Sequence, residues 1–115
     1  MKNNIIKERS YCFAIRVVKL YKHLSHEKRA FVLSKQLLRS GTSIGANVEE
    51  AVGGISKADF RAKLSIAYKE ARETIYGLRL LHDTNFIDDN SYHFIYQNAE
   101  ESGKILFPII QTTKK

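Results

Sequence analysis

Two glycines one helical turn apart constrain the packing of this chain more than any other feature. Gly41 and Gly45 lie in the stretch LLRSGTSIGANVEEA, which spans residues 37–51. On a helix they share one apolar stripe with Leu37, Leu38, Ile44 and Val48. Each glycine inside a helix costs roughly 1 kcal/mol relative to alanine. Because small residues on a buried face let a second backbone approach closely, the sequence predicts tight helix–helix packing here.

Apolar residues at three- and four-residue spacing predict four amphipathic helices, over residues 5–24, 29–52, 57–83 and 90–108. The clearest stripes comprise Ile6, Ser10, Phe13, Val17, Leu20 and Leu24 in the first segment, and Phe60, Leu64, Ala67, Ala71, Ile75, Leu78 and His82 in the third. The fourth stripe comprises Phe94, Ile95, Asn98, Ser102, Ile105, Leu106 and Ile109. Short connections imply antiparallel neighbours. Residues 1–115 are therefore predicted to form one all-α domain, an up-down-up-down four-helix bundle.

Local signals place the predicted helix ends. Ser25 is a candidate N-cap for the second helix, and Gly53-Gly54 should stop that helix. The third helix should begin with a capping motif formed by Ser56 and Asp59. Pro108, the sole proline, is expected to end or kink the fourth helix because it lacks a backbone N–H.

The first helix has a wider apolar surface than a four-helix monomer requires. Tyr11, Ile15 and Val18 extend its stripe to an arc of roughly 200°, where an arc of about 100–140° would suffice. We expect this surplus to mediate self-association. Wide burial within one monomer, or exposed apolar groups that are simply tolerated, remain alternatives.

The composition favours a soluble protein with a polyanionic partner. The net charge is +7, and residues 1–29 alone carry eight basic and two acidic groups. Neither a secretory signal nor an apolar run of roughly 18 residues is present in the sequence, so the expected location is the cytoplasm, without a membrane partner. With Cys12 as the sole cysteine, a disulfide framework within the chain is excluded.

Two rows of basic residues are candidates for phosphate binding. On the first helix, Lys2, Arg9, Arg16 and His23 recur every seven residues, with Lys19 on their flank. On the third helix, Arg61, Arg72 and Arg79 share a face. Such rows could follow a nucleic-acid backbone, with no signature of base-specific readout. The alternative is salt bridging, because Asp59, Glu70 and Glu73 lie on the same helix as the second row.

Residues that could support catalysis form no recognisable site. No glutamate precedes a histidine by three residues, as a di-metal bundle would need. Cys12 lacks an activating partner and is interpreted as a small apolar filler. His82 is interpreted as a hydrogen-bonded, partly buried histidine, and Asn47 as either exposed or bonded across a helix or subunit contact. We therefore expect no enzymatic activity, catalytic residue, cofactor or metal.

The stretch LLRSGTSIGANVEEA, with SKADFRAKLSIAYKEARETIYGLRLL after it, resembles a known bacterial family. FAIRVVKLY (residues 13–21) and FVLSKQLLRS (residues 31–40) extend the resemblance over nearly the whole chain. The family comprises four-helix-bundle proteins encoded in intervening sequences of 23S ribosomal RNA genes, also called ribosomal-protein-S23-like. A related group is the accessory proteins of diversity-generating retroelements, basic bundles associated with a reverse transcriptase. The resemblance implies a left-handed bundle and a ring of five subunits, with no established catalytic residues.

Two functions follow as hypotheses. In the first, a homo-oligomeric bundle binds structured RNA, alone or with a nucleic-acid enzyme, through Arg9, Arg16, Lys19, Arg61, Arg72 and Arg79. In the second, the protein is an assembly or adaptor module that binds protein partners through apolar surface, and its charge serves solubility. Both use a helix-packing or subunit interface formed by Tyr11, Ile15, Val18, Gly41, Gly45 and Asn47.

Overall fold

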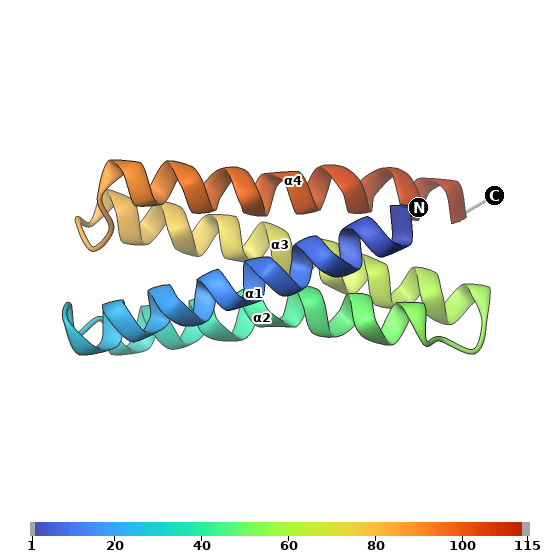
Figure 1. Cartoon of the computed structure of the whole chain (residues 1–115), viewed down its shortest axis with the longest axis horizontal. Coiled ribbons are helices and arrows are strands. Elements are labelled where there is room, and N and C mark those ends of the chain that lie inside the picture. The colour runs from blue at the N-terminus through green and yellow to red at the C-terminus, as the bar shows by residue number, and fades with distance from the viewer. Residues whose placement is uncertain (1, 114–115) are drawn as a thin grey trace.

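The computed structural model describes residues 2–113, with side chains from Ile5 onward, and these residues form four helices (Figure 1). They are α1 (Lys2–His26), α2 (Phe31–Val52), α3 (Lys57–Asp83) and α4 (Asp89–Thr113). Successive helices run in opposite directions, which confirms the predicted up-down-up-down bundle. Within residues 2–113, no helix combines the length and apolarity needed to cross a bilayer.

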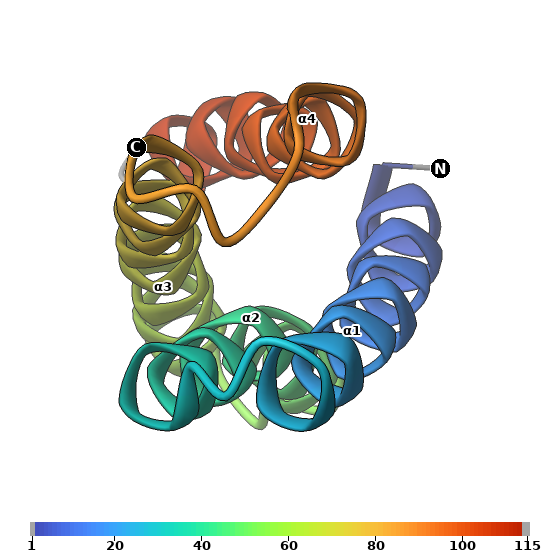
Figure 2. The same cartoon turned by 90° about the vertical axis from the view of Figure 1, so that its left-hand side faces the viewer.

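The helices occupy the four corners of an elongated bundle, with α1 opposite α3 (Figure 2). The most extensive contacts join α2 to α3 and α1 to α2, and the least extensive join α1 to α4. The reason is the slant of α1 across the bundle: its N-terminal end lies beside α4, and its C-terminal end lies beside α2 (Figures 1 and 2). One end of the α1–α4 seam is therefore more open than the other.

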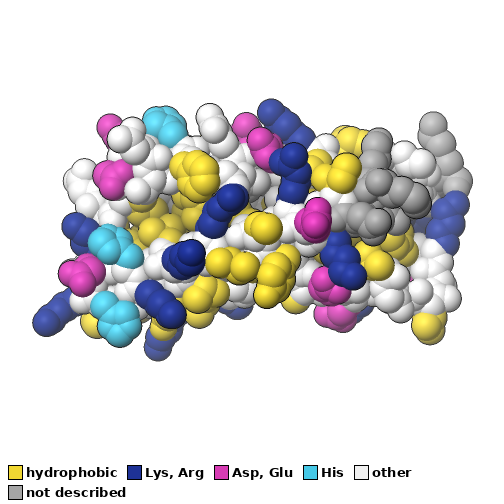
Figure 3. Space-filling model, in the orientation of Figure 1, with side chains coloured by type: hydrophobic (Ala, Val, Ile, Leu, Met, Phe, Trp, Pro, Cys, Tyr) yellow, Lys and Arg dark blue, Asp and Glu magenta, His cyan; other side chains and the backbone are white. Residues whose placement is uncertain are grey.

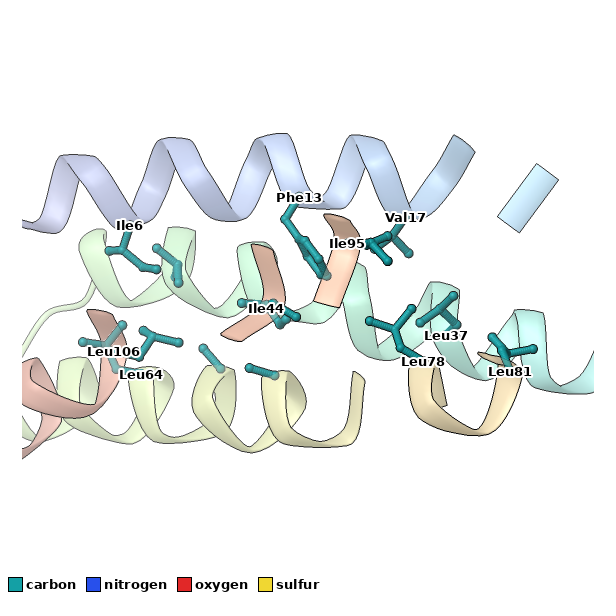
Figure 4. Packing of buried hydrophobic residues seen from close by; sticks show 14 of the residues in the cluster. Ile6, Phe13, Val17, Leu37, Ile44, Leu64, Leu78, Leu81, Ile95 and Leu106 are labelled. Carbon is teal, nitrogen blue, oxygen red and sulfur yellow. The ribbon is translucent and has the colours of Figure 1, made fainter. Parts of the chain in front are cut away.

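All four helices contribute to one continuous apolar core (Figure 4). Its largest fully buried side chains include Phe13 from α1, Ile44 from α2, Leu78 from α3 and Leu106 from α4. The stripe predicted for the first helix is confirmed, since five of its six members are buried and Leu20 packs against the core. In the fourth stripe, Phe94 is an exception, because 55% of its surface is exposed.

The glycine pair brings α1 and α2 into close contact, as predicted. A Cβ added to Gly41 would lie 2.7 Å from Val17 Cγ2, and one added to Gly45 would lie 3.2 Å from the backbone oxygen of Ser10. Both distances are shorter than ordinary van der Waals contact. The missing side chains therefore make room for Val17 and for the backbone of α1.

Two of the predicted helix-end signals are confirmed, and the one at the start of α2 is wrong. The Ser56 side chain accepts a hydrogen bond from the Asp59 N–H at 3.0 Å, and α2 ends with Gly53 as its C-cap. Ser25, the predicted N-cap, instead lies within α1 and donates to the Tyr21 carbonyl at 2.7 Å. The residue that precedes α2 is Ala30, whose buried side chain belongs to the core. Apolar burial thus sets this helix start in place of a polar cap.

The prediction that α4 ends or kinks at Pro108 is wrong as regards its end, since the helix continues to Thr113. An interior proline costs a helix about 3 kcal/mol. The next turn buries Ile109 and Ile110, and each buried isoleucine returns about 1.5–3 kcal/mol. Burial of this turn therefore outweighs the local penalty of the proline.

Substitution of Gly45 tests the close contact between α1 and α2. We expect Gly45→Leu to lower the free energy of unfolding by about 1–3 kcal/mol or more, because the side chain would meet the backbone of α1. Thermal and urea denaturation measure the change.

The matched control is Gly77→Leu on α3, where nothing lies within 4 Å of an added Cβ. This change should leave stability equal or raise it by up to about 1 kcal/mol through helix propensity. Equal effects of the two substitutions would show that Gly45 is not at a critical contact.

Candidate nucleic-acid interface

Two arginines of the first predicted row connect α1 to α4. The Arg9 guanidinium lies 2.5 Å from the Glu101 carboxylate, and Arg16 donates a hydrogen bond to the Asn98 side-chain oxygen. The Arg16 guanidinium also stands over the Phe94 ring, 4.9 Å from its centroid. The exposed Phe94 ring thus has a cation–π partner at the surface. Arg9 and Arg16 thus contribute to the α1–α4 seam, where helix contact is least extensive.

The other members of this row lie at the surface or outside the described side chains. Lys19 and His23 are exposed on α1. The side chain of Lys2 lies outside the part that the structure describes. Among the described residues, Lys19 has no ion-pair partner, so its charge is available to a ligand.

The second predicted row follows the seam between α3 and α4. Arg61 is half-buried and donates to the Thr113 carbonyl of α4 at 3.3 Å. Arg72 is exposed at a groove between the two helices. Arg79 is exposed seven residues further along α3. Its positive charge acts on Tyr92 of α4 and by itself lowers the pKa of that phenol. Burial has the larger effect and raises the pKa of Tyr92 above its usual range.

Two of the acidic residues on α3 that could have neutralised the arginines of this helix pair with Arg39 of α2 instead. Glu70 and Glu73 both accept from Arg39 of α2, with 3.0 Å between Arg39 Nη1 and Glu70 Oε2. These carboxylates raise the pKa of the Arg39 guanidinium, chiefly through the hydrogen bond to Glu73. Within residues 5–113, Arg72 and Arg79 form no ion pair with a carboxylate. The ion pairs of Glu70 and Glu73 therefore join α2 to α3, in place of the salt bridges within the third helix that the sequence offered as an alternative.

The aromatic side chains that lie beside the arginine row of α3 were not predicted from the sequence. Tyr68 of α3, with Tyr96 and Phe107 of α4, lines the same groove as Arg72. The spacing of seven and four residues from Tyr96 through Gly103 to Phe107 is a one-face helical pattern that could have revealed the α4 wall. The groove itself depends on the register of α4 against α3, which the sequence pattern does not encode.

The residues predicted for a subunit interface fall into two groups. Tyr11 and Ile15 are 64% and 42% exposed on the outer side of α1, and Val18 is half-buried beside them. Figure 3 shows hydrophobic side chains along this face, with Lys and Arg side chains around them. Gly41 and Gly45 are used within the monomer, and Asn47 donates to the Ser43 carbonyl of its own helix at 2.8 Å. Cys12, predicted as a filler, is exposed, because it lies beside Tyr11 on the outer side.

A hollow of about 730 Å³ at the open end of the bundle contains a histidine–carboxylate cluster. His82 Nε2 lies 2.7 Å from Asp89 Oδ1, and His82 Nδ1 lies 3.2 Å from Asp83 Oδ1. The imidazole stacks on Tyr92 with 4.0 Å between centroids. The hydrogen-bonded, partly buried histidine is confirmed. Among the described side chains, no group of three or more His, Cys, Asp or Glu residues is arranged to hold a metal ion.

His82 should make the stability of the bundle depend on pH. The hydrogen bond to Asp89, reinforced by Asp83, raises the pKa of His82 above its ordinary value. Its contribution should therefore be fully present below about pH 6.5, the pKa of an unperturbed histidine, and be lost as the pH rises through the raised value. Urea denaturation of wild type and His82→Gln should show a larger difference in unfolding free energy at pH 5.5 than at pH 8.5.

His26→Gln is the matched control, because His26 is exposed and contacts no carboxylate among the described residues. At pH 5.5 it should lower the free energy of unfolding less than His82→Gln does. A stability difference for His82→Gln that stays constant from pH 5.5 to 8.5 would contradict the imidazolium–carboxylate contribution.

Comparison with known proteins finds similarity over nearly the whole chain. The family described as 23S rRNA-intervening sequence protein matches residues 2–107. The crystal structure of a protein with unknown function from the S23 ribosomal protein family of Bacteroides thetaiotaomicron VPI-5482 is similar, with a TM-score of 0.95 and 51% sequence identity. The alignment covers 96% of this chain and 99% of that chain. Curated proteins include no match to the sequence. By both sequence and fold, the chain belongs to the family of 23S rRNA-intervening sequence proteins.

Proposed function

We propose that this protein binds structured RNA through the arginine row on α3. The observation that carries the proposal is the free charge of this row, because Glu70 and Glu73 pair with Arg39, and Arg72 and Arg79 have no carboxylate partner in the part of the chain that the structure describes. Arginine presents a planar fork that suits phosphate oxygens. A net charge of +7 adds long-range attraction for a polyanion.

The identity of the proposed ligand follows from the family. Its description names an intervening sequence of 23S rRNA, so structured ribosomal RNA is the natural first ligand to test. Lys19 extends the basic surface on α1, while Arg9 and Arg16 already have partners in α4. We therefore assign the main phosphate contacts to Arg72 and Arg79. The proposed role is in the cytoplasm and requires no catalytic step, cofactor or metal.

Self-association is part of the same proposal. The exposed Tyr11 and Ile15 offer apolar area on α1, which lies at the corner opposite α3. A ring of five copies, the number implied by the family resemblance, would repeat the arginine row five times. Repetition turns a modest patch into a broad basic surface without any new contact within the subunit.

Charge-neutralising substitutions test the RNA-binding surface. In fluorescence anisotropy with a structured ribosomal RNA fragment, wild type should bind saturably and weaken steeply as salt rises. Arg72→Gln with Arg79→Gln should weaken binding and reduce the slope of log affinity against log salt by about 1.5, since two phosphate contacts are lost.

Arg9→Gln with Arg16→Gln is the charge-matched control, because it removes the same two positive charges from a different seam. Light scattering should give an unchanged particle mass for both double variants. If both pairs weakened binding equally, affinity would follow net charge, and the α3 row would not be the binding surface.

The alternative function is a protein-assembly or adaptor module, and the exposed apolar face of α1 favours it. Tyr11→Ser with Ile15→Ser and Val18→Ser should reduce the particle mass measured by light scattering, because burial of apolar area stabilises subunit interfaces. Ile66→Ser with Tyr76→Ser is the control, since both residues are exposed on α3. An unchanged mass of the α1 variant would place the interface elsewhere, and absence of RNA binding at low salt would favour the adaptor.

A further inference from the structure

The groove between α3 and α4 has aromatic side chains on both walls. Its volume is about 410 Å³. Tyr68 of α3 faces Phe107 of α4, with 5.7 Å between ring centroids and a 48° angle between ring planes. Gly103 lies opposite Tyr68, and an added Cβ there would lie 3.7 Å from Tyr68 Cε1. The glycine therefore keeps the α4 wall low beside the Tyr68 ring.

Positive charges flank these rings on both helices. Arg72, which forms no ion pair with any described carboxylate, lines the α3 side, and Lys104 lines the α4 side. Glu100 also lines the groove and pairs loosely with Lys104, with 3.6 Å between Nζ and Oε1. Arg79 lies seven residues beyond Arg72, which is about 10 Å along the helix. The groove thus combines an apolar, aromatic interior with a rim of net positive charge.

We propose, on the basis of the function proposed above, that this groove accepts one unpaired nucleobase of a bound RNA strand. The base stacks against the exposed Phe107 beside Tyr68, and the flanking phosphate lies against Arg72 and Lys104. Aromatic rings stack with any base, so the site is tolerant of sequence. Bases in a duplex are already stacked and paired, so the groove favours loops, bulges and single strands.

Charge complementarity distinguishes this occupant from an apolar protein segment. An apolar protein side chain in the groove would pack against Tyr68, Tyr96 and Phe107. It would supply no anion for the Arg72 guanidinium. A nucleotide supplies both the flat apolar surface and the anion. The sugar–phosphate backbone of the same RNA strand can continue along the α3–α4 seam toward Arg79.

Base-specific fluorescence tests the groove. The probe is a short single-stranded RNA with 2-aminopurine at its centre, compared with the same strand carrying an abasic site there. We expect wild type to quench the 2-aminopurine by stacking and to bind the base-containing strand at least about fivefold more tightly than the abasic strand. Phe107→Leu should abolish this preference and leave affinity for the abasic strand unchanged.

Phe94→Leu is the matched control, because Phe94 is an exposed phenylalanine of α4 that faces α1. Tyr96→Leu is a second groove variant, and circular dichroism checks that each variant folds. Equal binding of both strands by folded wild type would overturn the groove site and leave the proposed function intact. No binding of either strand at low salt would overturn the groove site, and no binding of the structured ribosomal fragment would overturn the proposed function as well. A drop in particle mass for Phe107→Leu, with RNA binding unchanged, would assign the groove to a second copy of the chain and overturn the base site.

Discussion

The contact between α1 and α2 at Gly41 and Gly45 governs much of this bundle. The two glycines let the backbone of α1 approach α2 at Ser10 and let Val17 fit against Gly41. Close association with α2 leaves α1 with less contact to α4, particularly at its C-terminal end. Polar side chains then supplement the α1–α4 seam, since Arg9 pairs with Glu101 and Arg16 bonds to Asn98. The close α1–α2 contact is therefore accompanied by an α1–α4 seam in which Arg9 and Arg16, two arginines predicted to bind RNA, contact α4 instead.

The helices and most of their buried faces could be predicted because a 3.6-residue period carries that information locally. Helix ends were less predictable where a local signal competes with burial. Ser25 had the chemistry of an N-cap, yet α1 continues past it, and buried Ala30 precedes α2. Pro108 had the chemistry of a terminator, yet the burial of Ile109 and Ile110 extends α4 by another turn. In both places the deciding energy comes from residues on other helices.

The candidate site could be predicted only in part for the same reason. The alignment of Arg61, Arg72 and Arg79 follows from helical spacing, whereas the partners of Glu70 and Glu73 depend on which face of α2 meets α3. Arg39 of α2 takes both carboxylates, a pairing that no spacing within α3 could show. The aromatic groove likewise needs the register of α4 against α3. Cys12 and Phe94 were predicted to be buried and are exposed. The spacing of apolar residues shows which side of a helix faces the core, but it does not show how far around the helix burial extends.

The placement of α1 and α3 at opposite corners makes self-association and RNA binding compatible. An interface on the outer face of α1 would bury Tyr11 and Ile15 without covering Arg72, Arg79 or the groove beside Phe107. Closed cyclic symmetry places the same surface of every subunit in an equivalent position. The arginine rows of a ring would therefore form one repeating basic surface. A regular array of shallow, charged grooves would then be a physically simple route by which subunits of this size could bind a large folded RNA.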